Sequence, residues 1–165
     1  MLSGRDALIF LPLVLAICLW VAWSDMKFMK IPNKAVLALG GLFVLIGPLL
    51  LPFYDWLWAI ALMVIVLAIG FAMSTFRMVG AGDAKFAAAM APYFVGGDAV
   101  FIMLLIAACL IGALVVHRLL RRIPRVRAAT PDWMSWTRGD FPAGLALASA
   151  VLIYLLHLIR IDFLA

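Results

Sequence analysis

The sequence has few of the residues that commonly carry chemistry, and it contains no glutamate. Its eight acidic residues are all aspartates, it has only two histidines and two cysteines, and charged residues make up 13% of its 165 positions. Cys18 and Cys109 both lie inside apolar runs, where a free cysteine behaves as a small buried hydrophobe. With no Cys-x-x-Cys pair, and with only His117 and His157 as further ligands, we expect neither a metal site nor a bound cofactor.

Hydrophobic residues, in contrast, make up 68% of the chain, and the mean hydropathy is +1.22. A soluble domain typically has about 45–50% apolar residues, so a soluble chain of this length could not bury so much apolar surface. The composition therefore predicts an all-α, polytopic membrane protein with the lipid bilayer as its surroundings. The net charge of +5 does not indicate nucleic-acid binding, because the basic residues lie in loops between apolar segments.

The apolar runs predict about six transmembrane helices in a single integral-membrane domain that covers residues 1–165. The difficult segment is 86–117, because one helix of that length would measure about 48 Å against a hydrocarbon core of about 30 Å. Gly96-Gly97-Asp98 offers a natural break, which leaves a short fourth helix. The expected spans are approximately 7–24, 35–52, 56–76, 83–95, 99–117 and 141–160.

The basic residues predict the orientation of these spans. With the break at residues 96–98, 11 of the 13 lysines and arginines fall on one side of the membrane, and only Arg5 and Arg160 fall on the other. The positive-inside rule makes the basic side cytoplasmic. We therefore expect both termini outside and the loops that carry Asp25 and Asp83 in the cytoplasm.

The segment 118–139 is the only long polar loop. Five arginines lie between residues 118 and 127, and we expect them to bind lipid head groups. Trp133 and Trp136 suggest that part of this loop lies along the membrane interface.

Two aspartates at the ends of apolar runs are the candidate catalytic residues. Asp25 ends the first run, and Asp83 lies in the glycine-rich stretch 80–85 between two apolar segments. Two carboxylates in one site can share a proton, so that the ionised member activates a water molecule while the protonated member polarises a carbonyl group. This pair predicts peptide hydrolysis at a membrane face. Gly80 and Gly82 would shape the site by allowing a sharp bend and a close approach of the substrate.

The residues alone leave other roles open. Asp25 could cap a turn, and Asp83 could pair with Lys85 or cap the fourth helix. Lys85 is a third site-shaping candidate, either as an anchor that extends its amine to the interface or as a charge that tunes Asp83. Ser24 and Thr75 have no histidine nearby in sequence, so a nucleophilic triad is not indicated.

At these residues the sequence resembles the prepilin peptidases, which are membrane aspartic endopeptidases of the Gly-x-Gly-Asp type. The resemblance rests on Asp25 with Ile31-Pro32-Asn33, on Gly80-Ala81-Gly82-Asp83-Ala84-Lys85, and on Phe141-Pro142-Ala143-Gly144. It covers nearly the whole chain through its spans. It implies that Asp25 and Asp83 are the catalytic pair. The implied substrates are prepilins and pseudopilins, whose short leader is removed at the cytoplasmic membrane face, just before their hydrophobic N-terminal helix.

The resemblance also implies a cellular setting. The expected location is the inner (plasma) membrane of a bacterial cell, with a pilus assembly machinery as a further partner. Larger relatives carry an extra cytoplasmic segment, often with paired cysteines, and N-methylate the new terminus. This chain has only a ten-residue loop from Asp25 to Lys34 and resembles the short, peptidase-only form of tight-adherence (Flp) pilus systems, so methyl transfer is not expected.

Two readings from other functional classes compete with a peptidase. A small transporter or channel component would use membrane aspartates to relay protons or bind cations near the bilayer midplane. A structural subunit of a pilus or secretion machine would use both aspartates for folding only. Every aspartate here falls at a predicted span end or in a loop, which counts against the transporter.

Overall fold

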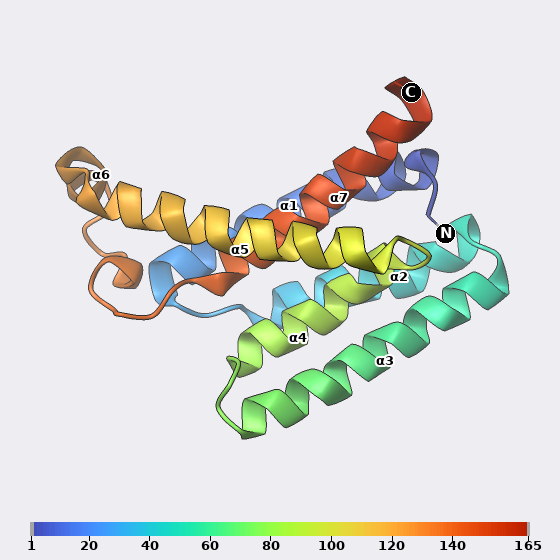
Figure 1. Cartoon of the computed structure of the whole chain (residues 1–165), viewed down its shortest axis with the longest axis horizontal. Helices are drawn as coiled ribbons and strands as arrows, with labels where there is room; N and C mark the ends of the chain where they lie inside the picture. Colours follow the sequence, from blue (N-terminus) through green and yellow to red (C-terminus); the bar gives the residue numbers. More distant parts are fainter. Residues whose placement is uncertain (1, 165) are drawn as a thin grey trace.

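The computed structural model describes residues 2–164, and its regular structure is entirely helical over that range. Seven α-helices and two short 3₁₀ helices follow one another along these residues, without a strand (Figure 1). Their bounds are Gly4–Phe28 (α1), Asn33–Leu50 (α2), Phe53–Thr75 (α3), Ala81–Met90 (α4), Ala91–Phe94 (η1), Ala99–Arg122 (α5), Pro124–Ala129 (α6), Met134–Trp136 (η2) and Ala143–Leu164 (α7).

Five of the described helices, α1, α2, α3, α5 and α7, are long and apolar enough to cross a membrane. The expected fourth span is different: α4 has 10 residues and η1 adds 4, so the continuous segment has 14 residues. At about 1.5 Å per residue this segment is roughly 21 Å long, which is shorter than a hydrocarbon core of about 30 Å. The structure therefore supports five full-length spans rather than six, with a shorter helical segment packed among them.

The break after this short segment lies where the sequence predicts it. Gly96 has a left-handed φ of 74°, a conformation that glycine adopts without steric cost. Asp98 then caps α5, because its carboxylate accepts a hydrogen bond from the backbone N–H of Phe101 at 2.6 Å. A glycine turn followed by a capping aspartate ends one helical segment and starts the next.

The buried core lies between α1, α2, η1 and α7. Phe10 stacks on Phe43, and both rings meet Tyr93 edge to face. The hydroxyl of Tyr93 donates a hydrogen bond to the carbonyl oxygen of Leu39 at 3.0 Å, so its polar end is satisfied inside the core. These aromatic contacts hold the end of the short helical segment against α1 and α2.

The helix ends define two opposite ends of the bundle. At one end the backbone N–H of Gly4 donates to the carboxylate of Asp162, so the start of α1 lies beside the end of α7. At the other end Asp25, late in α1, lies beside Gly144, at the start of α7. The two chain ends are therefore near one another and far from the aspartate at position 25. Which end faces the cytoplasm remains a prediction from the loop charges.

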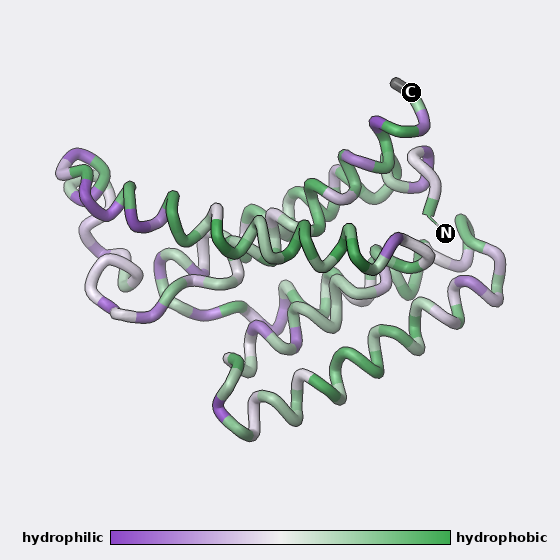
Figure 2. Tube along the Cα trace, viewed as in Figure 1, coloured by the Kyte–Doolittle hydropathy of each residue, from purple (hydrophilic) through white to green (hydrophobic). Residues whose placement is uncertain are grey.

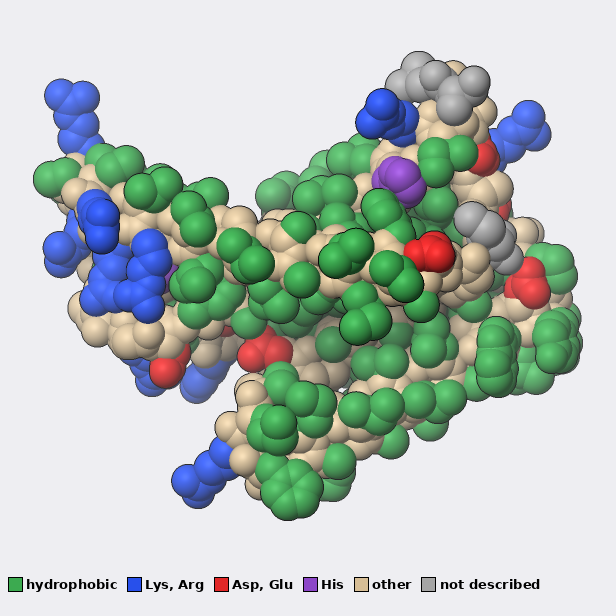
Figure 3. Space-filling model, viewed as in Figure 1, with side chains coloured by type: hydrophobic (Ala, Val, Ile, Leu, Met, Phe, Trp, Pro, Cys, Tyr) green, Lys and Arg blue, Asp and Glu red, His purple; other side chains and the backbone are tan. Residues whose placement is uncertain are grey.

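Most residues along the long helices are hydrophobic (Figure 2). α3 and α5 bury few of their residues against the rest of the molecule, and large hydrophobic side chains project from both. A helix that is apolar on all sides but little buried by its own chain suits a lipid environment. Lysine and arginine side chains gather instead at the end formed by the last turns of α5 and by α6 (Figure 3).

The polar loop is more ordered than the sequence predicts. α5 continues to Arg122, and Trp136 is buried rather than exposed at an interface. Its ring stacks on His117 with the centroids 5.4 Å apart, and its indole N–H donates to the carbonyl oxygen of Thr130 at 3.0 Å. The loop thus folds back on α5, and of its two tryptophans Trp133 keeps part of its surface exposed whereas Trp136 does not.

The close packing of α3 on α4 yields a stability prediction. A Cβ atom at Gly70 would lie 2.9 Å from the Cβ and 3.3 Å from the Cα of Ala84. Gly70→Ala should therefore push the two helices apart and lower the melting temperature in detergent, at a cost of about 1–3 kcal/mol. Gly112→Ala is the control, because a Cβ there meets no atom within 4 Å. Because alanine has a higher helix propensity than glycine, Gly112→Ala should leave the melting temperature unchanged or raise it. Equal melting temperatures for the two variants would contradict the close packing.

Candidate active site

A cavity of about 510 Å³ opens at the end of the bundle opposite the chain termini, and both candidate aspartates line it. Its walls come from three separate parts of the chain. One is the end of α1 with the loop that follows, the second is the start of α4, and the third is the segment that leads into α7. Asp25 and Asp83 are 58 positions apart in the sequence, yet their carboxylates are close enough to interact electrostatically.

Asp25 is held in place by the way α1 ends. It lies in the last turn of the helix and is only 5% exposed. Met29 stops the helix in a left-handed conformation with φ at 52°, and its N–H donates to the carbonyl oxygen of Asp25 at 2.9 Å. The hydroxyl of Ser24 donates to the carbonyl oxygen of Lys30 at 2.9 Å, which fixes the loop that turns away. The Met29 N–H and the Ser24 hydroxyl therefore both stabilise the turn directly after Asp25.

The Asp25 carboxylate reaches across to α7. Its Oδ2 accepts a hydrogen bond from the backbone N–H of Gly144 at 2.7 Å. Gly144 is the second residue of α7, where the backbone N–H has no partner inside the helix. Asp25 therefore satisfies the start of another helix with one oxygen, while Oδ1 makes no hydrogen bond within residues 2–164.

Ile31 fills the space between the three walls. A Cβ atom on Gly144 would lie 2.8 Å from Oδ2 of Asp25 and 3.0 Å from Cδ1 of Ile31, so no side chain fits there. A Cβ atom on Gly82 would lie 3.5 Å from the Cβ of Ile31, which is an ordinary contact distance. The isoleucine thus packs against both glycines and joins the loop after α1 to α4 and α7.

Asp83 lies in the first turn of α4, and its carboxylate folds back over Gly80. A Cβ atom on Gly80 would lie 2.6 Å from Oδ2 of Asp83. The position of the carboxylate therefore depends on glycine at position 80. Asp83 is half-buried, and burial raises the pKa of its carboxyl above the ordinary value. Among the described residues it forms neither a cap on α4 nor an ion pair with Lys85.

Lys85 points away from Asp83. Its Nζ donates a long hydrogen bond of 3.4 Å to Oδ1 of Asn33, at the start of α2. Its side chain is exposed at the rim of the cavity. This contact links α4 to the start of α2.

Several cavity residues were not among the site residues expected from the sequence. The segment before α7 contributes Arg138, Asp140 and Phe141 to the wall. Gly144 was visible only as part of the resemblance to Phe-Pro-Ala-Gly, without a role. No pattern of spacing could show that its N–H meets Asp25, because 119 positions separate them. Within residues 2–164, no group of three or more His, Cys or Asp side chains is placed to hold a metal ion.

The burial of Asp83 predicts a pH-dependent effect on stability. Since its pKa is higher in the folded state than the ordinary value of 3.8, folding favours the protonated form. Stability should fall as the pH rises through the interval between these two pKa values. Asp83→Asn removes this penalty, so above that interval it should raise the melting temperature in detergent by about 2 °C or more.

The advantage of Asp83→Asn should shrink as the pH is lowered towards about 4, because the wild-type carboxyl is then protonated in both states. Asp132→Asn, at an exposed loop position, is the control and should show no such trend. A melting temperature for Asp83→Asn below that of the unmodified protein at pH 8 would contradict the prediction.

Comparison with known proteins places this geometry in context. Residues 12–116 match the type IV leader peptidase family, and this match covers more than half of the chain, including both aspartates. No curated protein and no solved structure matches the chain. The matched region spans α2, α3 and α4 together with most of α1 and α5, and it ends before α7. The chain therefore belongs to the type IV leader peptidase family.

Proposed function

We propose that this protein is a membrane-embedded aspartic endopeptidase that removes the leader peptide of prepilin-like substrates, with Asp25 and Asp83 as its catalytic residues. One observation carries the proposal. The two carboxylates come from separate helices and line the same cavity, at the end of a bundle of apolar helices. Family membership supports a peptidase in general terms, and the paired carboxylates supply its chemistry.

The chemistry needs one carboxylate ionised and the other protonated. The ionised carboxylate accepts a proton from a water molecule, and the water oxygen attacks the carbonyl carbon of the scissile peptide bond. The protonated carboxyl gives its proton to the carbonyl oxygen as charge develops there. The resulting diol collapses when one of its hydroxyl protons returns to a carboxylate and the amide nitrogen receives a proton. The carbon–nitrogen bond then breaks.

The contacts of the two carboxylates are consistent with one of them acting as the base and the other as the acid. The Gly144 N–H holds Oδ2 of Asp25, which lines the cavity, and Oδ1 has no hydrogen bond among the described residues. The carboxylate of Asp83 is held less firmly, by its fit over Gly80. No hydrogen bond joins the two carboxylates among the described residues, and the proposal puts a water molecule and the scissile carbonyl group in the cavity that both line.

The same proposal places the cavity at the cytoplasmic face of a bacterial inner membrane. The loops at this end of the bundle carry most of the lysines and arginines, as the positive-inside rule requires of a cytoplasmic face. The chain ends lie at the opposite end. The short loop between α1 and α2 has no paired cysteines, so we propose peptidase activity without methyl transfer.

A transporter remains the main alternative. Proton or cation relays place acids near the middle of the membrane on facing helices. Asp25 and Asp83 lie instead at one end of the bundle, in the last turn of α1 and the first turn of α4. A purely structural role has support at Asp25, which caps α7, but not at Asp83, which has no hydrogen-bond partner among the described residues.

The decisive test replaces each aspartate with asparagine. Asp25→Asn and Asp83→Asn should each reduce leader cleavage of a co-expressed prepilin by a factor of about 10³ or more, because one carboxylate cannot supply both roles. Cleavage is read as a gel shift. Asp55→Asn, in the first turn of α3 and away from the cavity, is the matched control and should cleave normally.

Membrane insertion of the variants is checked by detergent extraction and gel filtration. The asparagine at position 25 can still accept the Gly144 hydrogen bond, so the fold should survive. Full cleavage by either single variant would refute the proposal.

The two glycines of the Gly-x-Gly-Asp stretch should respond differently to alanine. Gly80→Ala places a Cβ only 2.6 Å from Oδ2 of Asp83, so it should displace the carboxylate and lower kcat/KM about tenfold or more. Gly82→Ala adds a Cβ at an ordinary distance from Ile31, so it should stay within about twofold of the unmodified protein. Equal losses in the two variants would show that the glycines act through backbone flexibility rather than through space for Asp83.

A further inference from the structure

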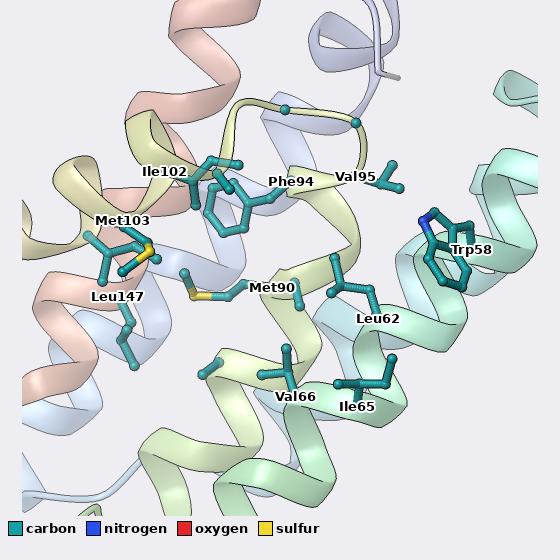
Figure 4. A pocket seen from close by; sticks show the side chains of 16 residues that line it. Trp58, Leu62, Ile65, Val66, Met90, Phe94, Val95, Ile102, Met103 and Leu147 are labelled. Carbon is teal, nitrogen blue, oxygen red and sulfur yellow. The ribbon is translucent and has the colours of Figure 1, made fainter.

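A second cavity, of about 460 Å³, is lined by residues that lie farther along α4 and η1 than those of the aspartate cavity. It is lined by α3, α4, η1 and α5, and Leu147 of α7 also contributes to its lining (Figure 4). Trp58, Leu62 and Ile65 of α3 face Ile102 and Met103 of α5 across it. No charged side chain lines this cavity, which we call the α3/α5 groove.

The groove opens towards the lipid between two helices. Trp58 on one wall is 62% exposed, and Met103 on the other wall is 71% exposed. α5 packs mainly on α7, whereas α3 packs mainly on α4, so the two walls are not pressed together. An apolar cavity with such an opening can take an apolar guest directly from the membrane.

The floor of the groove is the face of α4 that carries Asp83. Ala87 and Met90 line the groove, and they follow Asp83 by four and seven residues. Residues at this spacing lie on one side of an α-helix. An apolar helix that lies along this floor therefore has one end pointing towards Asp83. Asp83 lies about one helical turn (roughly 5.4 Å) beyond Ala87.

We infer that the α3/α5 groove binds the apolar helix that follows the cleavage site of the substrate. The inference rests on the proposed peptidase function, and it adds the binding surface that would set the position of the cut. A substrate whose scissile bond directly precedes an apolar helix needs an apolar surface that begins beside the catalytic carboxylates. The groove meets this need, because its floor continues the Asp83 face of α4.

Another largely apolar cavity, of about 590 Å³, lies between α2 and α3 and is the alternative binding surface for the apolar helix of the substrate. We call it the α2/α3 cavity. Its floor is the opposite face of α4, formed by Ala88 and Ala89, and this face carries Lys85 rather than Asp83. A helix seated there would be directed towards Lys85 and Asn33, which are joined at 3.4 Å. The α2/α3 cavity therefore serves as an internal control.

The first experiment fills each cavity with the same side chain. Ala87→Leu fills the floor of the α3/α5 groove, and Gly41→Leu projects into the α2/α3 cavity, where a Cβ meets no atom within 4 Å. For cleavage of a full-length prepilin in detergent, Ala87→Leu should raise KM about tenfold with a smaller change in kcat, while Gly41→Leu should change neither by more than about twofold. Equal kinetics for Ala87→Leu and the unmodified protein would overturn the inference.

The second experiment reads binding without relying on cleavage. A photoreactive benzoylphenylalanine replaces Met103 in the α3/α5 groove or Leu37 in the α2/α3 cavity, and each variant is reconstituted with the prepilin in lipid vesicles. Crosslinking to the prepilin from position 103 and not from position 37 is expected. Prepilin crosslinks from position 37 alone, or lipid adducts alone from position 103, would overturn the inference.

The two experiments separate the inference from the proposed function. If the unmodified protein fails to cleave the prepilin, the proposed function fails, and the crosslink pattern still decides whether the groove holds the apolar helix. If cleavage proceeds and the crosslinks come from the α2/α3 cavity, only the inference fails.

Discussion

The hydrogen bond from the Gly144 N–H to the Asp25 carboxylate is the contact on which the rest of the site depends. A carboxylate buried without a partner is costly, and a backbone N–H at the start of a helix has no partner of its own. Each group satisfies the other at 2.7 Å. Because position 144 has no side chain, Ile31 can enter the space beside this contact and also meet Gly82 of α4. One polar contact between the first and last helices thus sets the positions of the loop after α1 and, through Ile31, of the helix that carries Asp83.

The short helix α4 has two faces with different surroundings. One face carries Asp83 and continues into the α3/α5 groove, and the other carries Lys85 and lies over the α2/α3 cavity. Gly70 lets α3 approach α4 closely, so the helix is held along its side rather than by its ends alone. With η1 included, its length is about two thirds of a membrane span.

The sequence predicts the helical class and the break at Gly96, and the structure agrees on both. Asp25 and Asp83 line one cavity, and their catalytic pairing stays a prediction. Charge and hydropathy carry that information locally. Charge and hydropathy patterns do not show which distant segments of the chain contact one another. The partner of Asp25 on α7 and the burial of Trp136 depend on how helices pack, which no local pattern records. The sequence predicts a short fourth helix, and the structure has a 14-residue segment there beside five longer apolar helices.

The pairing of α1 with α7 also bears on the order in which the protein can assemble. During synthesis the first helix enters the membrane long before the last one exists, so the Asp25 carboxylate has no N–H partner while the helices between them are made. Pairing of the first and last long helices along the chain is the most non-local step available to this chain, and such steps come late in folding. The aspartate cavity is therefore completed only when α7 has joined the bundle, because α7 and the segment before it supply part of the cavity wall.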